Sequence, residues 1–371
     1  MKKISLLCVL ILFISGKIVG DEKTRPLSPD GPYLFYNADS SVRMIQIYND
    51  GHIKDTICYN IPDSLNIEIH DTQGKYNFNF TISSNINDIL IPAYKYKQAD
   101  SIFVISDIHG RLDLFVELLV SHNIIDKNLQ WNFGSNQLLI LGDIFDRGDD
   151  VTQIFWLVVK LEQEAKKTGG SVSFILGNHE TMILAGDIRY ATEKYRLVSD
   201  TLNLALNELY AKNTWLGKWI ASKNTIEISG DYMFVHAGIS EDLCDKYKDP
   251  AIVNGVIRNN LFYSKQQKKE MSDTVKFMFG NKGPVWYRGM VRNEQKYNPI
   301  TDSALKKIKK QYNVKHIIVG HTIMDDVCEF FNGSVIAVNV DNKKNFIENK
   351  SRGLLLTDKS RHIIYNNQFS K

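Results

Sequence analysis

Six side chains that can bind metal ions follow five short apolar runs of this 371-residue chain. The runs are 102–105, 138–141, 172–176, 232–235 and 316–319, and the side chains are Asp107, His109, Asp143, Asn178, His236 and His321. A mixture of Asp, Asn and His suits Mn²⁺, Fe or Zn²⁺, whereas a structural zinc site favours thiolates. Two such ions, about 3.5–4 Å apart, can share one carboxylate. The set therefore predicts a two-metal hydrolytic site.

The elements that must position these side chains are strands that end in polar, glycine-containing loops. Apolar helix candidates at 112–120 and 153–167 lie between the runs, which predicts an α/β fold with strands covered on both faces. In open α/β sheets, ligands bind outside the carboxyl ends of the strands. Five strand ends that each deliver Asp, Asn or His are hard to explain by packing alone.

The segment before residue 100 has a different pattern. Alternating runs at 42–48, 53–61, 65–69 and 76–82 are separated by turn signals, among them Asn49-Asp50-Gly51. This predicts a small antiparallel β domain over 21–99, a structural cap or interaction module without a catalytic constellation, followed by the catalytic domain over 100–371. Helical insertions are expected at about 185–230 and 240–285, with one helical stretch at 202–220, and they would form a lid or side wall.

Composition and the first residues narrow the class of protein. A net charge of +3 argues against a dedicated nucleic-acid binder. A basic start at 1–3 and an apolar run at 4–15 predict a signal peptide over 1–20, hence a secreted or periplasmic protein with no stable membrane insertion after cleavage. The widely spaced Cys58, Cys244 and Cys328 indicate neither a disulfide framework nor a thiol nucleophile.

Five motifs in order resemble those of the calcineurin-like metallophosphoesterases, in the phosphoprotein phosphatase branch. They are SDIHG at 106–110, GDIFDRG at 142–148, GNHE at 177–180, HAG at 236–238 and GH at 320–321. Segments 30–33, 216–224 and 283–289 look like the bacterial Shewanella-like phosphatases. The resemblance implies a β-sandwich flanked by helices. Ser106 replaces the usual Gly, Ile323 stands where many relatives have a metal-binding His, and the C-terminal active-site Tyr of the eukaryotic enzymes has no counterpart.

The resemblance also implies a role for each candidate residue. Asp107, His109 and Asp143 would bind the first ion, with Asp143 bridging to a second ion that Asn178, His236 and His321 bind. Arg147 and Arg288 would hold the phosphate, since a guanidinium matches two oxygens. His179 would protonate the leaving group, with Asp146 orienting it. A metal-bridging hydroxide would attack in line. Manganese is the expected metal, with iron or zinc as alternatives.

Three functions compete on the sequence alone. The first is a phosphomonoesterase acting on phosphoproteins (Ser/Thr or Tyr) or small phosphate esters. The second is a dinucleoside polyphosphate or other nucleotide hydrolase, because His321-Thr322 resembles a motif of those enzymes. The substrates of those enzymes are cytoplasmic, so the predicted signal peptide argues against this function. The third is a secreted binding protein with an inert phosphatase domain. For Asp143 and Asp146 the non-catalytic alternative is capping of the helix that follows. The sequence does not define an oligomeric state.

Overall fold

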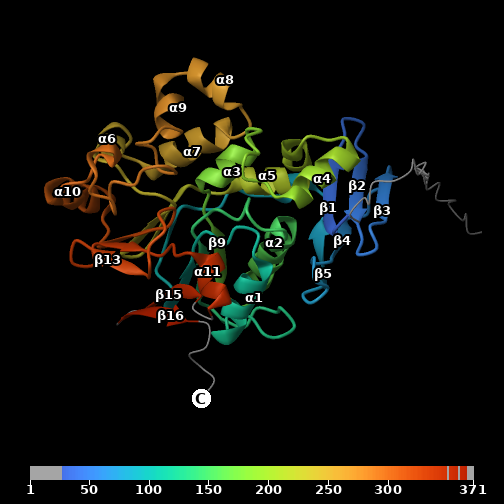
Figure 1. Cartoon of the computed structure of the whole chain (residues 1–371), viewed down its shortest axis with the longest axis horizontal. Helices are drawn as coiled ribbons and strands as arrows, with labels where there is room; N and C mark the ends of the chain where they lie inside the picture. Colours follow the sequence, from blue (N-terminus) through green and yellow to red (C-terminus); the bar gives the residue numbers. More distant parts are fainter. Residues whose placement is uncertain (1–26, 349–350, 358–359, 366–371) are drawn as a thin grey trace, which may run out of the picture.

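The computed structural model describes residues 27–348, 351–357 and 360–365. The predicted signal peptide, 1–20, lies outside these residues. Among the residues described, none of the helices has the length and apolar character needed to cross a membrane. A central pair of β-sheets is surrounded by helices, and the N-terminal strands lie at one end of the molecule (Figure 1).

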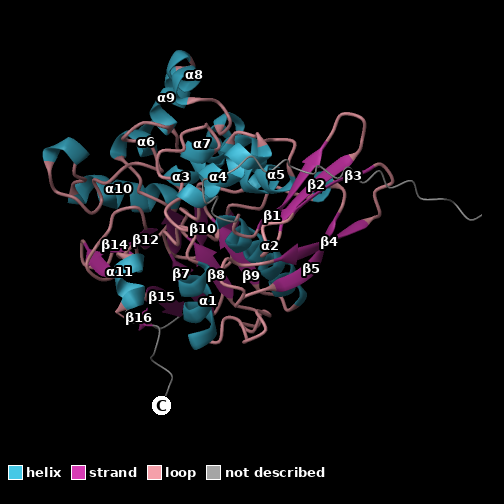
Figure 2. Ribbon diagram, turned by 45° about the vertical axis from the view of Figure 1, so that its right-hand side comes forward, coloured by secondary structure: helices cyan, strands magenta, loops and turns pink. Residues whose placement is uncertain are grey.

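Two sheets form the sandwich (Figure 2). The first contains, in spatial order, β13 (Cys328–Phe330), β14 (Val335–Ala337), β12 (His316–Val319), β11 (Tyr232–Val235), β10 (Ile226–Ser229) and β6 (Lys95–Tyr96). The second contains β16 (Arg361–Tyr365), β15 (Arg352–Thr357), β7 (Ser101–Ile105), β8 (Gln137–Ile140) and β9 (Ser171–Phe174). Strands β7, β8 and β9 pair in parallel, as do β11, β12 and β14. The predicted α/β sandwich flanked by helices is confirmed.

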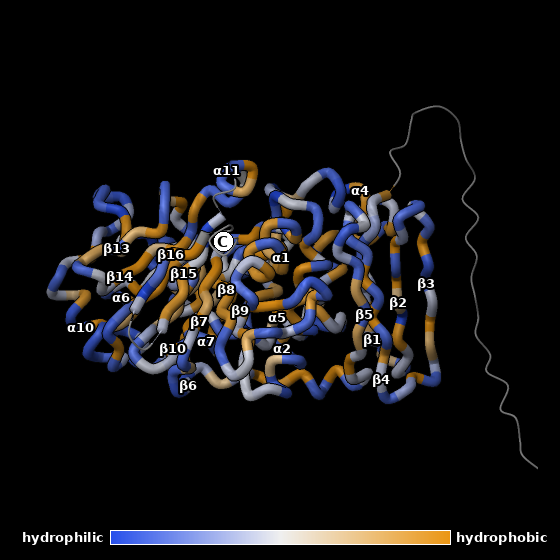
Figure 3. The backbone as a smooth tube through the Cα atoms, turned by 90° about the horizontal axis from the view of Figure 1, so that it is seen from below, coloured by the Kyte–Doolittle hydropathy of each residue, from blue (hydrophilic) through white to orange (hydrophobic). Residues whose placement is uncertain are grey.

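Both faces of the sandwich strands are buried, which explains their nearly continuous apolar sequence. Val104 and Leu139 of one sheet share a buried cluster with Phe234 and Ile318 of the other, so this cluster fills the space between the sheets. Alternate residues such as Phe103 belong to a second cluster, which includes the helix side chains that cover the sheets. Figure 3 shows these apolar strands running through the catalytic part of the chain.

The helices cover the sandwich and build the loops above it. They are α1 (Leu112–Ser121), α2 (Val151–Lys167), α3 (Asn178–Ile183), α4 (Glu193–Leu202), α5 (Trp215–Ser222), α6 (Glu241–Lys246), α7 (Pro250–Asn260), α8 (Lys265–Glu270), α9 (Asp273–Met278), α10 (Asp302–Tyr312) and α11 (Asn342–Ile347). Three short 3-10 helices, η1 (Ile86–Asp88), η2 (Leu206–Tyr210) and η3 (Gln295–Tyr297), complete the set in the described ranges. The first half of α2 is fully buried, as its apolar sequence predicts.

The prediction of one continuous helix over 202–220 is wrong. Helix α4 ends at Leu202 because Asn203 takes a left-handed conformation (φ 51°), which Asn tolerates better than most residues. The helix η2 and then α5 follow. Trp215 and Trp219 of α5 pack on Trp156 and Phe174, with ring centroids 5.1 and 5.8 Å apart. This part of the insertion therefore covers the core of the domain.

The N-terminal strands form two small antiparallel sheets, β1 (Asp30–Tyr36), β2 (Val42–Ile47) and β3 (Ile53–Cys58), and β4 (Ser64–Ile69) with β5 (Phe78–Ser83). They are joined tightly to the catalytic part. Trp156 Nε1 donates to the carbonyl of Pro32 (3.2 Å), and buried Asp30 lies 3.4 Å from Lys194 Nζ. Strand β6 pairs with β10, so the chain already contributes to the sandwich before residue 100.

A buried carboxyl group lies between the two sheets. Glu227 on β10 is 2% exposed, and it accepts a hydrogen bond from Asn224 Nδ2 (3.1 Å). Burial raises the pKa of Glu227 to about 7, opposed by Asn224, Ser173 and Lys223 and reinforced by the negative charge of Glu162. Its other carboxylate oxygen, Oε2, is buried without a hydrogen-bond partner. Glu227 is therefore a source of pH-dependent stability remote from the metal ligands.

Glu227→Gln should be more stable than wild type at pH 8, and this gain in the free energy of unfolding should be smaller at pH 5. Between the ordinary value of 4.5 and about 7, the folded state binds more protons than the unfolded state, so wild-type stability falls as pH rises. The penalty above pH 7 is about 3 kcal/mol, and Glu227→Gln removes it. Urea unfolding at both pH values measures this. The exposed Glu294→Gln is the control, and identical pH slopes for wild type and Glu227→Gln would contradict the prediction.

Candidate active site

The six predicted metal-binding side chains meet where β7, β8, β9, β11 and β12 end. The loops that carry them are hydrogen-bonded to one another through their backbones. His109 N donates to Asp143 O (2.9 Å), Asp107 N to Gly142 O (3.2 Å) and Gly320 N to His236 O (2.7 Å). Side chains that are up to 214 residues apart in sequence are thus held in one cluster.

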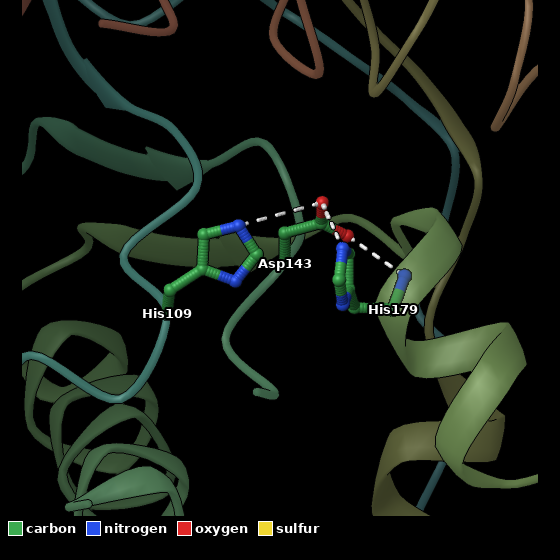
Figure 4. Close-up of side chains that lie close together, drawn as sticks. All are labelled: His109, Asp143 and His179. Carbon is green, nitrogen blue, oxygen red and sulfur yellow. Dashed lines mark hydrogen bonds and ion pairs between the residues drawn. The ribbon is translucent and has the colours of Figure 1, made fainter. Parts of the chain in front are cut away.

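Asp143 lies at the centre of this cluster. Its Oδ2 is 3.3 Å from His236 Nε2, 3.9 Å from His179 Nε2 and 4.0 Å from His109 Nε2. Figure 4 shows His109 and His179 on two sides of this carboxylate, with the backbone nitrogen of His179 donating to Oδ1 (2.9 Å). Two buried groups have ligand atoms within 4.8 Å of one another: His109, Asp143 and His179, and Asp143, His236 and His321. Asp143 is the residue that they share.

The tautomers of these histidines fit cation binding. His109 Nδ1 is 2.8 Å from the carbonyl of Phe145 and His236 Nδ1 is 2.6 Å from that of Leu141, so both Nδ1 atoms donate and both Nε2 atoms keep a lone pair. His109 Nε2 and His321 Nε2 are buried without a hydrogen-bond partner. A buried polar atom without a hydrogen-bond partner destabilises the folded state. Divalent cations bound at these two nitrogen atoms would give each of them a partner.

His236 and Asn178 give a second indication of a cation. His236 Nε2 and Asn178 Oδ1 are 2.9 Å apart, although with Nδ1 donating both atoms are acceptors. Burial lowers the pKa of His236, but the charge and hydrogen bond of Asp143, the charge of Asp107 and the carbonyl of Leu141 together raise that pKa to about 9. A positive charge is therefore favoured between these two atoms, and a divalent cation would supply it. The residues present fit divalent metal ions.

Two asparagines that the sequence analysis missed hold the first predicted ligand. Asn339 Nδ2 donates to Asp107 Oδ2 (2.7 Å), and Asn342 Nδ2 donates to the carbonyls of Ser106 (2.9 Å) and Asp107 (3.2 Å). Burial, reinforced by the charge of Asp143, raises the pKa of Asp107 to about 6. A bound cation would favour the charged form instead. No motif marks these asparagines; the only cue is that they follow the apolar strand β14.

Glu180, the last residue of the GNHE motif, fixes the loop that carries Asp143. Its fully buried carboxylate accepts from the backbone nitrogens of Asp143 (2.9 Å), Ile144 (2.9 Å) and Gly177 (2.8 Å). A Cβ at Gly177 would lie 2.2 Å from Asp143 Oδ1, so only glycine permits this approach. Besides the predicted ligand Asn178, the GNHE motif thus contains Glu180, which positions the Asp143 loop, and Gly177, which lets Asp143 approach closely.

The backbone of the site is strained. Six of the ten predicted site residues have φ between 49° and 71°, a range that non-glycine residues rarely adopt: Asp107, His109, Asp143, Asp146, Arg147 and His321. Such conformations cluster at functional sites, where surrounding contacts hold them. Here the interloop hydrogen bonds and Glu180 provide those contacts.

Charged and aromatic groups line the opening of the cluster. Arg147 is exposed, with Nη2 3.5 Å from His179 Nε2, and half-buried Arg288 donates from Nη1 to Thr322 Oγ1 (3.0 Å). His179 Nδ1 lies 2.5 Å from Asp146 Oδ2. Trp286 stands perpendicular to His321, at a centroid distance of 5.7 Å. All ten predicted residues therefore belong to one site, with an arginine on each side of the cluster.

A buried carboxylate-imidazole cluster at the strand ends of a sandwich, with an arginine on each side, defines a metal-dependent phosphoesterase. The model of the calcineurin-like phosphoesterase family matches residues 101–325, and the chain belongs to this family. It is therefore a phosphoesterase hydrolase, and the family implies divalent metal ions.

Similar proteins place the chain more narrowly, near the Shewanella-like phosphatases. A crystal structure of a cold-active protein-tyrosine phosphatase of a psychrophilic Shewanella species superimposes with a TM-score of 0.80, at 31% identity over 91% of this chain and 97% of that one. Shewanella-like protein phosphatase 1 of Plasmodium berghei is 28% identical over 60% of each chain. Shewanella-like protein phosphatase 2 of Arabidopsis thaliana is 34% identical over 30% of this chain and 28% of its own length. The predicted resemblance is confirmed.

Proposed function

We propose that this protein is a metal-dependent phosphomonoesterase acting on phosphoproteins, with manganese as the working metal. The observation that carries the proposal is the buried cluster around Asp143, in which His109 Nε2 and His321 Nε2 lack partners. In this proposal Asp107, His109 and Asp143 hold one ion, and Asp143 with Asn178, His236 and His321 holds the other. When bound, two such ions supply Lewis acidity and an activated water nucleophile.

The two arginines suit the terminal phosphate of a monoester. Arg147 extends into solvent beside His179, where an incoming phosphate would meet it first. Arg288 is half-buried and is held by Thr322 Oγ1, so its guanidinium has a fixed direction. A planar guanidinium can donate two hydrogen bonds to phosphate oxygens and stays charged at all working pH values. Together they would orient the phosphate and neutralise its charge.

His179 is the proposed general acid, which would protonate the leaving oxygen. Its Nδ1 bonds to Asp146 Oδ2, so Nε2 is the atom that carries the transferable proton, and this atom lies next to Arg147. Asp146 would fix the ring orientation, as a carboxylate partner does for other catalytic histidines. Phosphoprotein substrates, phosphotyrosine first, are supported by the names of the relatives: one is a protein-tyrosine phosphatase and two are protein phosphatases.

Hydrolysis of para-nitrophenyl phosphate after chelation tests the proposal. Activity should disappear when the metal is removed and return when Mn²⁺ is added, more fully than with Zn²⁺ or Mg²⁺. Matched phosphotyrosine and phosphoserine peptides would then rank the substrates. If the folded protein binds metal but hydrolyses neither para-nitrophenyl phosphate nor the peptides with any of these ions, the proposal is wrong.

A further inference from the structure

An exposed aromatic ring lies beside the site, on the loop between α3 and α4. Tyr190 is 47% exposed, although it lies beside deeply buried residues. Its ring centroid is 5.4 Å from that of His179, and the Arg147 guanidinium lies 5.7 Å from it. Tyr190 thus contacts the proposed general acid and one proposed phosphate ligand at once.

The position of this ring is fixed by its surroundings. The backbone nitrogen of Arg147 donates to the carbonyl of Tyr190 (3.2 Å), which ties the α3–α4 loop to the loop that carries Asp146. Arg189 lies 6.0 Å from the ring centroid and is itself held by Asp187 through two hydrogen bonds of 2.8 and 2.5 Å. Cations at these distances from an aromatic face are attracted to it. These contacts hold the Tyr190 ring in place, while about half of its surface remains exposed to solvent.

The leaving group of a bound substrate would lie next to the Tyr190 ring. The atom that His179 Nε2 would protonate is the oxygen that joins phosphate to the rest of the substrate. If that oxygen carries an aromatic ring, the ring begins one bond beyond it. Aromatic pairs attract at centroid distances of about 4.5–7 Å, and the Tyr190 centroid lies within that range of His179. An aliphatic leaving group, as in phosphoserine, presents no π face to Tyr190.

We propose that Tyr190 is a specificity-determining residue, which stacks on the aromatic leaving group of phosphotyrosine and so favours aryl over alkyl phosphates. This rests on the proposed phosphatase function and assigns part of its substrate preference to one side chain outside the metal and phosphate-binding set. The ring supplies the contact, so the hydroxyl group of Tyr190 is dispensable. The effect should appear as a fall in the ratio of phosphotyrosine to phosphoserine hydrolysis. If Tyr190 only packed on His179, its loss would impair the general acid, which an alkyl leaving group needs more than an aryl one, and the ratio would rise instead.

The test compares Tyr190→Leu and Tyr190→Phe with wild type on phosphotyrosine and phosphoserine peptides of the same flanking sequence. The matched control is Tyr263→Leu, which removes another exposed tyrosine ring close to a cation, with Lys212 5.6 Å away. In Tyr190→Leu the ratio of kcat/KM for phosphotyrosine over phosphoserine should fall about 2- to 10-fold, the range expected for one stacked aromatic pair. Tyr190→Phe and Tyr263→Leu should keep the wild-type ratio.

The outcomes separate this inference from the proposed function. If wild type hydrolyses both peptides and Tyr190→Leu leaves their ratio unchanged or raises it, Tyr190 only packs on the site and the inference is overturned. The inference is equally overturned if Tyr190→Phe loses the preference, because then the hydroxyl group decides it. A metal-loaded wild type that hydrolyses neither peptide would overturn the proposed function and this inference with it.

Discussion

Asp143→Asn should abolish turnover and lower the metal content of the protein. Asp143 is the residue common to both buried groups of potential ligands, and its Oδ2 is within 4.0 Å of three imidazole Nε2 atoms. An amide is a weaker ligand than a carboxylate for hard cations and carries no charge to offset theirs. The loss should exceed the roughly 10²–10⁴-fold expected from removing a general acid.

Metal analysis of the purified variant and hydrolysis of para-nitrophenyl phosphate measure this effect. His236→Ala should behave in the same way, because His236 belongs to the second group. Asp71→Asn is the matched control, since Asp71 is a similarly buried aspartate in the loop between β4 and β5, where it accepts a hydrogen bond from the backbone nitrogen of Tyr76 (2.9 Å). A folded Asp143→Asn protein with full metal content and full activity would remove Asp143 from the proposed mechanism.

His179→Ala should keep the metal ions but lose turnover by about 10²–10⁴-fold, toward the upper end of that range for poor leaving groups. The geometry makes this a sharp test, because His179 also lies in a potential ligand group with His109 and Asp143. Its Nδ1 is bonded to Asp146, and its Nε2 is 3.9 Å from Asp143 Oδ2. A general acid and a metal ligand predict opposite results for metal content.

Alkyl and aryl phosphates distinguish the two roles further. An alkoxide needs protonation more than a nitrophenolate does, so the loss in His179→Ala should be larger on an alkyl phosphate. Asp146→Asn should retain metal and show the same substrate pattern with a smaller loss, because it would only misorient the ring. Depleted metal in His179→Ala would make His179 a ligand, and full activity on a poor leaving group would exclude the acid role.

Much of the site could be predicted because its ligands are local in sequence. Asp107, Asp143 and His236 follow apolar strands within a few residues, and parallel strands bring their carboxyl ends to one edge. The metal identity, the role of each site residue, the domain boundaries and the secretory compartment stay predictions. The prediction of a helix over 202–220 is wrong because it used the spacing of apolar residues alone. Asn203 ends helix α4 in a left-handed conformation, and apolar spacing carries no information about this.

The sequence by itself determined the family, the sandwich fold and the ten candidate site residues, because motifs that join a strand to a ligand loop are short-range and ordered along the chain. Only the tertiary structure decided what supports and surrounds them. Asn339 reaches Asp107 across 232 residues, and the carbonyl of Tyr190 accepts from the backbone nitrogen of Arg147 although two helices and a strand separate them in the chain. The left-handed conformations of Asp107 and Asp143 have no sequence signal either. These features depend on hydrogen bonds and packing between distant segments, which exist only once the chain has folded.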